Sequence, residues 1–205
     1  MSVAIQFDPI RLPPEAEALR AEVRKFLKNE IAAGTFDPNE DSQDNLEFSR
    51  KVGKKGWIGM TWPKKYGGQE RSFLDRYVVN EEFLVARAPT RRHFTADRQS
   101  GPVLIKYASE EIKQDILPRI IKGELSFCIG MSEPDSGSDL FAAKTRAERT
   151  ANGWLINGRK LWTSRAHESD YMIGLFRTSA PTQENRRHGL SQFLVDMKTP
   201  GISTR

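Results

Sequence analysis

Small and polar residues follow a short apolar run in the middle of the chain, and their types suit the binding of a ligand. Ser126 to Gly130 has the pattern of a buried segment, after which Met131 and Ser132 offer a backbone amide and a hydroxyl. Gly137 and Ser138 then let another backbone or a ligand approach closely, because glycine carries no side chain. These groups can donate hydrogen bonds to a bound molecule.

A second polar segment, residues 160–164, reads Lys-Leu-Trp-Thr-Ser and follows the turn signals Asn152-Gly153 and Asn157-Gly158. It places two hydroxyls directly behind an indole. Each residue also has a simpler interpretation when it is taken alone. Trp162 is typical of a strand residue that packs in a core, Ser132 of a turn hydroxyl, and Ser138-Asp139 of a helix cap.

Together the two segments resemble the motifs of the acyl-CoA dehydrogenase family. The first motif there reads hydroxyl-Glu-Pro, two small residues, then Gly-Ser-Asp, and residues 132–139 match it except that Asp135 replaces a small residue. The second reads aromatic, variable residue, then Thr or Ser after a Lys, as in residues 160–164. The resemblance covers nearly the whole chain, because Trp62-Pro63 and Tyr66-Gly67-Gly68 precede these motifs in the family's order.

The resemblance implies half of an FAD site. Met131 and Ser132 match positions whose backbone, together with the Ser132 hydroxyl, contacts the pyrimidine side of the isoalloxazine. Trp162 matches an aromatic residue that covers one flavin face, and Thr163 and Ser164 complete that motif, with the Ser164 hydroxyl near flavin O4 and N5. Ser138 matches a residue that contacts the acyl-CoA substrate, close to its pantetheine or phosphates.

The resemblance also implies a reaction. Family members desaturate an acyl-CoA thioester in fatty-acid and lipid metabolism: a carboxylate base removes the α-proton while the β-hydride moves to flavin N5. That base is a glutamate of the C-terminal domain, so no residue of this chain receives a catalytic role, and Glu133 is expected to be structural. The expected electron acceptor is electron-transfer flavoprotein or another acceptor, and the expected assembly is a homo- or hetero-oligomer.

The last residues, Ile202 to Arg205, look like the start of a strand whose partner and continuation are absent. Family members continue through further strands and a C-terminal four-helix domain to nearly twice this length, so the β-domain is expected to be incomplete. Three hypotheses stay open: an N-terminal portion of a dehydrogenase, a naturally short subunit completed by a partner chain, and a non-catalytic binding protein.

Composition limits which class of protein and which cellular location fit this sequence. The 205 residues are 38% hydrophobic, and no apolar run approaches the roughly 20 residues that span a bilayer. The first eight residues lack the layout of a secretory signal, so a cytoplasmic protein without a membrane segment is expected. The single cysteine, Cys128, excludes an intramolecular disulfide and is expected to be a small buried residue, and the three histidines are too far apart to indicate a metal site.

The net charge of +5 comes from 32 basic and 27 acidic residues. Attraction to nucleic acid, membranes or a phosphorylated ligand is one explanation of such an excess. The basic residues are dispersed among acidic ones, however, and no basic run carries interleaved aromatics, so a solvated surface is favoured and no nucleic-acid partner is expected. A missing acidic portion of a longer protein would explain the charge equally well.

The first 123 residues show helical periodicity. The pattern predicts an amphipathic helix from Glu15 to Ile31 that ends near Gly34. Asp44 is predicted to cap a helix through Lys55, and Ser72 a longer one with a broad apolar face. The predicted members of that face are Leu74, Tyr77, Val78, Leu84 and Val85. Two further helices are predicted, from Gly101-Pro102 to about Ala108 and from Ser109, with a restart at Pro118, up to Gly123.

From residue 124 the period changes to that of strands. Strands are predicted up to Thr150, at 154–156, at 171–176 and at 190–195, all antiparallel, with residues 179–189 as an exposed hairpin loop. Runs of helices followed by runs of strands predict an α+β fold. We therefore expect an all-α domain over residues 1–123 and a partial antiparallel β-domain over residues 124–205.

Overall fold

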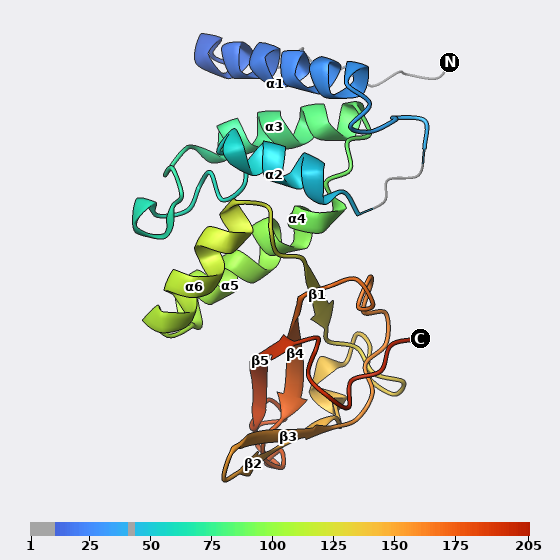
Figure 1. The fold of residues 1–205 in the computed structure, drawn as a ribbon. Helices are drawn as coiled ribbons and strands as arrows, with labels where there is room; N and C mark the ends of the chain where they lie inside the picture. The colour runs from blue at the N-terminus through green and yellow to red at the C-terminus, as the bar shows by residue number, and fades with distance from the viewer. Residues whose placement is uncertain (1–10, 41–43) are drawn as a thin grey trace, which may run out of the picture.

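A computed structural model describes residues 11–40 and 44–205. The helices lie at one end of the molecule and the strands at the other, with the chain passing once between them (Figure 1). The α-helices are α1 (Pro14–Ala32), α2 (Leu46–Lys54), α3 (Phe73–Val85), α4 (Arg91–Thr95), α5 (Gly101–Tyr107) and α6 (Glu110–Ile121). Short helical turns are η1 (Lys64–Tyr66), η2 (Ala96–Ser100) and η3 (Leu140–Ala142). The strands are β1 (Phe127–Gly130), β2 (Arg146–Thr150), β3 (Gly153–Asn157), β4 (Tyr171–Arg177) and β5 (Leu190–Asp196).

The predicted first helix is confirmed. Pro14 occupies the first turn of α1, where its missing N–H costs no hydrogen bond, and Gly34 follows the helix with a φ of 73°. The apolar face of α1 is buried against α3, and its buried residues are Ala16, Leu19, Val23, Phe26 and Leu27. The expectation that the first eight residues carry no secretory signal lies outside the described residues.

Helix α2 is capped by Asn45 and not by Asp44. The Asn45 side chain accepts a hydrogen bond from the amide of Phe48 at 2.8 Å, whereas Asp44 pairs with Arg92 at 2.6 Å. The prediction of Asp44 was wrong because both residue types cap helices well and the distant arginine is invisible in the local sequence. The caps predicted for the later helices are confirmed, since Ser72 accepts the amide of Asp75 and Ser109 that of Ile112.

The predicted apolar face of α3 was wrong in most of its members. Of the predicted residues only Val78 is buried, and the helix packs inward through Val78, Val79 and Phe83. Leu74, Tyr77, Leu84 and Val85 are exposed, and so is Phe73. Helix α3 carries apolar residues on both sides, so periodicity alone could not choose which side faces α1.

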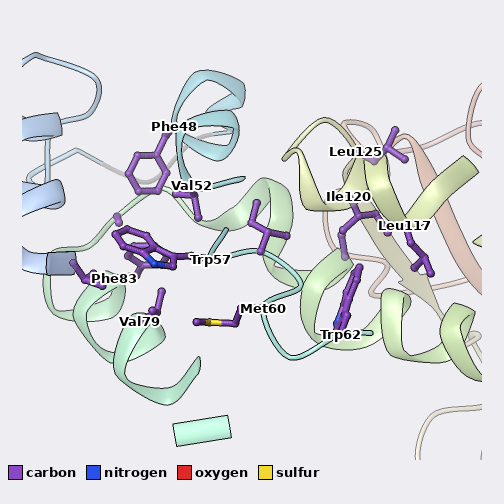
Figure 2. Packing of buried hydrophobic residues seen from close by; sticks show 14 of the residues in the cluster. Phe48, Val52, Trp57, Met60, Trp62, Val79, Phe83, Leu117, Ile120 and Leu125 are labelled. Carbon is purple, nitrogen blue, oxygen red and sulfur yellow. The ribbon is translucent and has the colours of Figure 1, made fainter. Parts of the chain in front are cut away.

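Aromatic residues close the core of the helical half. Trp57 meets Phe26 edge-on with ring centroids 5.1 Å apart, and Trp62 is buried beside Ile120 and Leu117 (Figure 2). A Cβ atom on Gly101 would lie 2.1 Å from the Trp62 ring, so only glycine lets α5 pass this indole. The loop at residues 57–63 thus fills the core with its aromatic and aliphatic side chains.

The strands form one mixed sheet, and the α+β fold class is confirmed. The sheet order is β1-β4-β2-β3, and β5 pairs with β4 outside this path. Two strand pairs are antiparallel as predicted, β2 with β3 and β4 with β5. Two other pairs are parallel: β1 with β4, and β2 with β4 at their single pairing. The purely antiparallel arrangement was wrong because residues 131–170, between β1 and β4, are long enough for a parallel crossover connection.

Strand β1 was not foreseen as a strand of its own. It occupies the apolar run after Ser126 and pairs with the first half of β4, and three of its four residues are buried. Cys128 lies in β1 and is buried, as expected, and burial raises the pKa of its thiol. Within the described residues, no helix combines the length and the apolar composition needed to cross a membrane.

Candidate functional site

The two polar segments identified in the sequence lie side by side where β1 ends. Strand β1 leads directly into Met131 and Ser132, and the amide of Leu161 donates a hydrogen bond to the Ser132 carbonyl at 2.8 Å. This single backbone contact joins residues that are 29 positions apart in the chain. The geometry therefore brings the Met131-Ser132 segment and the Lys160–Ser164 segment into one location.

A buried ion pair fastens the same two segments. The ammonium group of Lys160 lies 2.7 Å from Oε1 of Glu133 and donates to the Met131 carbonyl at 3.0 Å. Both side chains are less than a tenth exposed. Glu133 also accepts the backbone N–H groups of Lys144 at 2.6 Å and Thr145 at 3.0 Å, so each oxygen of its carboxylate is hydrogen-bonded.

The protonation of Glu133 follows from these contacts. Burial alone raises the pKa of a carboxyl group, but the hydrogen bonds from Lys160, Thr145 and the Lys144 amide outweigh it and lower the pKa of Glu133 to about 2. Burial lowers the pKa of Lys160, and Glu133 opposes that change. Glu133 is therefore an ionised residue that holds the loop, in agreement with the structural role expected of it.

The Lys160 contact also decides how the Met131–Ser132 peptide is turned. No cis peptide bond occurs in the described chain, and in a trans peptide the C=O and N–H groups point in opposite directions. Because the Met131 carbonyl points at Lys160, the Ser132 N–H points away from it. The amide expected to donate to a ligand is thus directed away from the ion pair.

Trp162 is exposed and does not belong to a strand. Its side chain is 86% exposed and its backbone has a φ of 56°, a left-handed conformation that costs energy for a residue with a large side chain. The interpretation of Trp162 as a core residue is therefore wrong: this left-handed loop turns the indole outward. A strained loop that presents an indole to the surface is typical of a functional site.

The two hydroxyls after Trp162 differ in their surroundings. The Thr163 hydroxyl oxygen is buried and has no hydrogen-bond partner within residues 11–40 and 44–205, whereas Ser164 is exposed. A buried hydroxyl without a partner costs free energy, so a bound molecule that pairs with it gains affinity. Thr163 thus carries the hydrogen-bonding group that stays unused in the Lys160–Ser164 segment.

Ser138 is exposed, on the stretch ahead of η3. Its neighbour Asp139 precedes the helical turn without making a side-chain cap hydrogen bond, and pairs instead with Arg186 at 2.6 Å. The interpretation of Ser138-Asp139 as a helix cap is therefore wrong. The predicted contact of Ser138 with a substrate stays a prediction.

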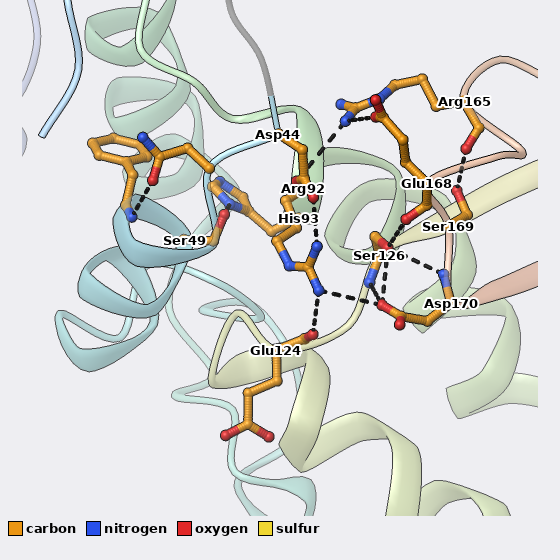
Figure 3. Close-up of polar contacts among 12 residues, drawn as sticks. Asp44, Ser49, Arg92, His93, Glu124, Ser126, Arg165, Glu168, Ser169 and Asp170 are labelled. Carbon is orange, nitrogen blue, oxygen red and sulfur yellow. Dashed lines mark hydrogen bonds and ion pairs between the residues drawn. The ribbon is translucent and has the colours of Figure 1, made fainter.

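A polar network that the sequence did not reveal connects the helical half to the loop behind Ser164 (Figure 3). Arg92 of α4 donates to Asp44 at 2.6 Å, to the Glu124 carbonyl at 2.9 Å and to Asp170 at 3.4 Å. Asp170 also accepts the amide and the hydroxyl of Ser126, each at 2.9 Å. These partners are 32 to 78 positions from Arg92, so no local pattern could have indicated them.

Comparison with known proteins agrees with this architecture. The model of the acyl-CoA dehydrogenase N-terminal domain matches residues 13–124, and that of the acyl-CoA dehydrogenase middle domain matches residues 128–205. The chain belongs to the acyl-CoA dehydrogenase family.

Three relatives illustrate the match to this family. Acyl-CoA dehydrogenase FadE26 of Mycobacterium tuberculosis is 32% identical over 202 residues, which are 95% of this chain and 50% of FadE26. The ChsE4-ChsE5 complex of Mycobacterium tuberculosis matches with a TM-score of 0.77 and 33% identity, over 92% of this chain and 48% of that one. A glutaryl-CoA dehydrogenase of Mycobacterium smegmatis in complex with FADH2 matches with a TM-score of 0.75 and 25% identity, over 94% and 48%. The chain spans about half the length of the relatives it matches.

The residues present fit the flavin of acyl-CoA dehydrogenases. A flavin ring has a flat face and an edge of hydrogen-bond acceptors, and the site offers an exposed indole at Trp162 beside the unpaired hydroxyl of Thr163. The amide of Ser132, which points away from Lys160, supplies a further donor. These groups suit the edge of such a ring better than they suit a metal ion, which needs acceptor ligands.

Proposed function

We propose that this chain forms half of the FAD site of an oxidoreductase that desaturates an acyl-CoA thioester between its α and β carbons. The observation that carries the proposal is the junction of residues 131–132 with residues 160–164, where an exposed Trp162 adjoins the buried, unpaired hydroxyl of Thr163. Both family matches, and a relative that holds FADH2, support it.

Each residue of the half-site has a defined part. The Ser132 amide and hydroxyl and the Thr163 and Ser164 hydroxyls donate hydrogen bonds to the edge of the ring, and Trp162 covers one face and excludes water from it. Bound FAD would supply the chemistry of hydride acceptance. Donors at that edge favour the electron-rich reduced ring, so these residues set how readily it is reduced. Ser138 is proposed to contact the CoA portion of the substrate.

The base that removes the α-proton comes from outside this chain. Glu133 is the carboxylate nearest to the motifs in sequence, but its ion pair with Lys160 and its pKa of about 2 make it a poor base at neutral pH. We therefore assign no catalytic residue among residues 1–205, and we place the base on the half that relatives possess and this chain lacks.

That half is supplied either by a longer form of this protein or by a partner chain. The ChsE4-ChsE5 complex is a relative whose solved form contains two differently named chains, which supports the partner alternative and a hetero-oligomer. The other two alternatives are a homo-oligomer of a longer chain and a non-catalytic binding protein. We further propose electron-transfer flavoprotein or a similar acceptor as the electron partner, and the cytoplasm as the location.

The proposed cofactor site is tested by titrating FAD into the wild-type protein and into Thr163→Val, which removes the unpaired hydroxyl at nearly constant volume. We expect wild type to bind FAD and Thr163→Val to bind it roughly tenfold more weakly, because an acceptor on the flavin edge loses the hydroxyl that donates to it. Thr150→Val, on the exposed face of β2, is the matched control. Absence of FAD binding by the wild-type chain together with the half that completes it would refute the proposed function.

A further inference from the structure

The Lys160–Glu133 pair makes a set of contacts that a simple surface ion pair does not need. Besides Glu133, the Lys160 ammonium reaches the Met131 carbonyl at 3.0 Å and lies 5.4 Å from the centre of the Phe176 ring. The stem of Lys160 passes over Gly130, where a Cβ atom would lie 3.4 Å from its Cγ. The charge is thus enclosed by the carboxylate, the carbonyl and the aromatic ring.

Burying such a pair is costly, and the cost is unnecessary for stability alone. A buried ion pair is often no more stabilising than well-packed apolar residues of the same size, because both charges lose their hydration. Here the pair connects the two ligand-binding segments: Glu133 follows Ser132, and Lys160 precedes Leu161 and Trp162. An ion pair in this position favours a role in holding the two segments in a fixed geometry.

We propose that Lys160, held in place by Glu133, is a positioning residue of the flavin site that fixes the Met131–Ser132 peptide with its N–H directed toward the cofactor. This inference rests on the proposed function. The ammonium accepts no hydrogen bond and donates up to three, so it attracts the Met131 carbonyl and prevents the peptide from turning over. Glu133 keeps the ammonium in place because two backbone amides hold its carboxylate.

The test compares FAD affinity and folding stability in the protein that contains this chain, with FAD itself as the probe. Lys160→Met keeps most of the unbranched side chain but cannot donate to the Met131 carbonyl, so FAD is expected to bind roughly tenfold more weakly. The matched control is Lys144→Met. Lys144 pairs with Asp135 at 3.0 Å on the surface of the same loop, with both side chains more than two-thirds exposed. We expect its FAD affinity to stay within about twofold of wild type.

A double variant separates positioning from folding. Lys160→Met leaves Glu133 buried and unpaired, whereas Glu133→Gln/Lys160→Met removes both charges and is expected to regain thermal stability. Positioning by Lys160 requires that the double variant still binds FAD weakly and that the absorption maximum of its bound flavin is shifted. Recovery of wild-type FAD affinity together with stability would show that the pair only holds the fold.

The outcomes also distinguish this inference from the proposed function. If wild type and Lys160→Met bind FAD equally well, the positioning role is overturned and the FAD site stands. If wild type binds no FAD, both are overturned. A loss of affinity in Lys144→Met as large as that in Lys160→Met would mean that any charge change on this loop acts alike, which also overturns the positioning role.

Discussion

The ring of His93 is enclosed in the helical half, where its Nδ1 lies 2.8 Å from the hydroxyl oxygen of Ser49. Burial lowers the pKa of His93 from 6.5 to about 3, so the folded protein keeps this ring neutral at physiological pH. The unfolded chain, by contrast, takes up a proton near pH 6.5. The unfolded state therefore binds more protons between these two values.

This difference predicts a pH-dependent stability. The contribution of His93 is fully present above about pH 6.5 and is lost as the pH falls toward 3, by about 1.4 kcal/mol per pH unit. Urea unfolding at pH 7 and pH 5.5 should show this slope in wild type and in His167→Gln, whose side chain is exposed, and not in His93→Gln. An unchanged slope in His93→Gln would contradict the assignment.

Trp162 gives a second prediction at the residue scale. Because its side chain is 86% exposed, Trp162→Ala should change the free energy of unfolding by no more than about 0.5 kcal/mol. Its affinity for FAD should nevertheless fall roughly tenfold, since an aromatic contact with the ring is lost. Trp154→Ala, on β3 where the indole packs on Phe193, is the control and should leave FAD affinity unchanged. A loss of stability without a loss of affinity would place Trp162 in the fold instead.

The elements of the fold differ in how well the sequence predicts them. Helix α1 and the caps Ser72 and Ser109 were predictable because they depend on neighbours within four positions. The sequence could not predict the parallel pairing of β1 with β4 or the Arg92 network, because both join residues more than 30 positions apart. The two ligand segments were recognised as motifs, but their contact through Lys160 and Glu133 appears only in the fold. The domain boundary at residue 123 stays a prediction.

The Arg92 network gives a prediction at the element scale. Arg92→Met leaves the partly buried carboxylate of Asp170 without its cation and leaves Asp44 only the more distant Arg165 at 3.8 Å, which should destabilise the fold by about 3 kcal/mol. Arg91→Met is the control, because Arg91 precedes it on α4 and is exposed. The comparison requires urea unfolding of both variants. Equal stability of the two would show that the network contributes nothing to joining α4 with β4.

At the scale of the whole molecule, the chain has a buried hydrophobic core and a proposed cofactor half-site, but only half the length of the relatives it matches. Helix α3 leaves Phe73, Tyr77 and Leu84 exposed, which is a large apolar surface for one helix. The carboxylate of Glu133 is held in a buried ion pair with Lys160. We therefore propose two separate capacities: this chain contributes to holding the flavin, and another half supplies the base.

The most direct test is anaerobic addition of an acyl-CoA to the FAD-loaded protein while the visible flavin absorption is recorded, once with this chain alone and once with the half that completes it. The account predicts that the flavin band persists with the chain alone and bleaches only in the completed protein, because reduction requires the base. Bleaching by the chain alone would contradict the claim that residues 1–205 lack a base. Persistence of the band in the completed protein with every acyl-CoA tested would contradict the desaturation itself.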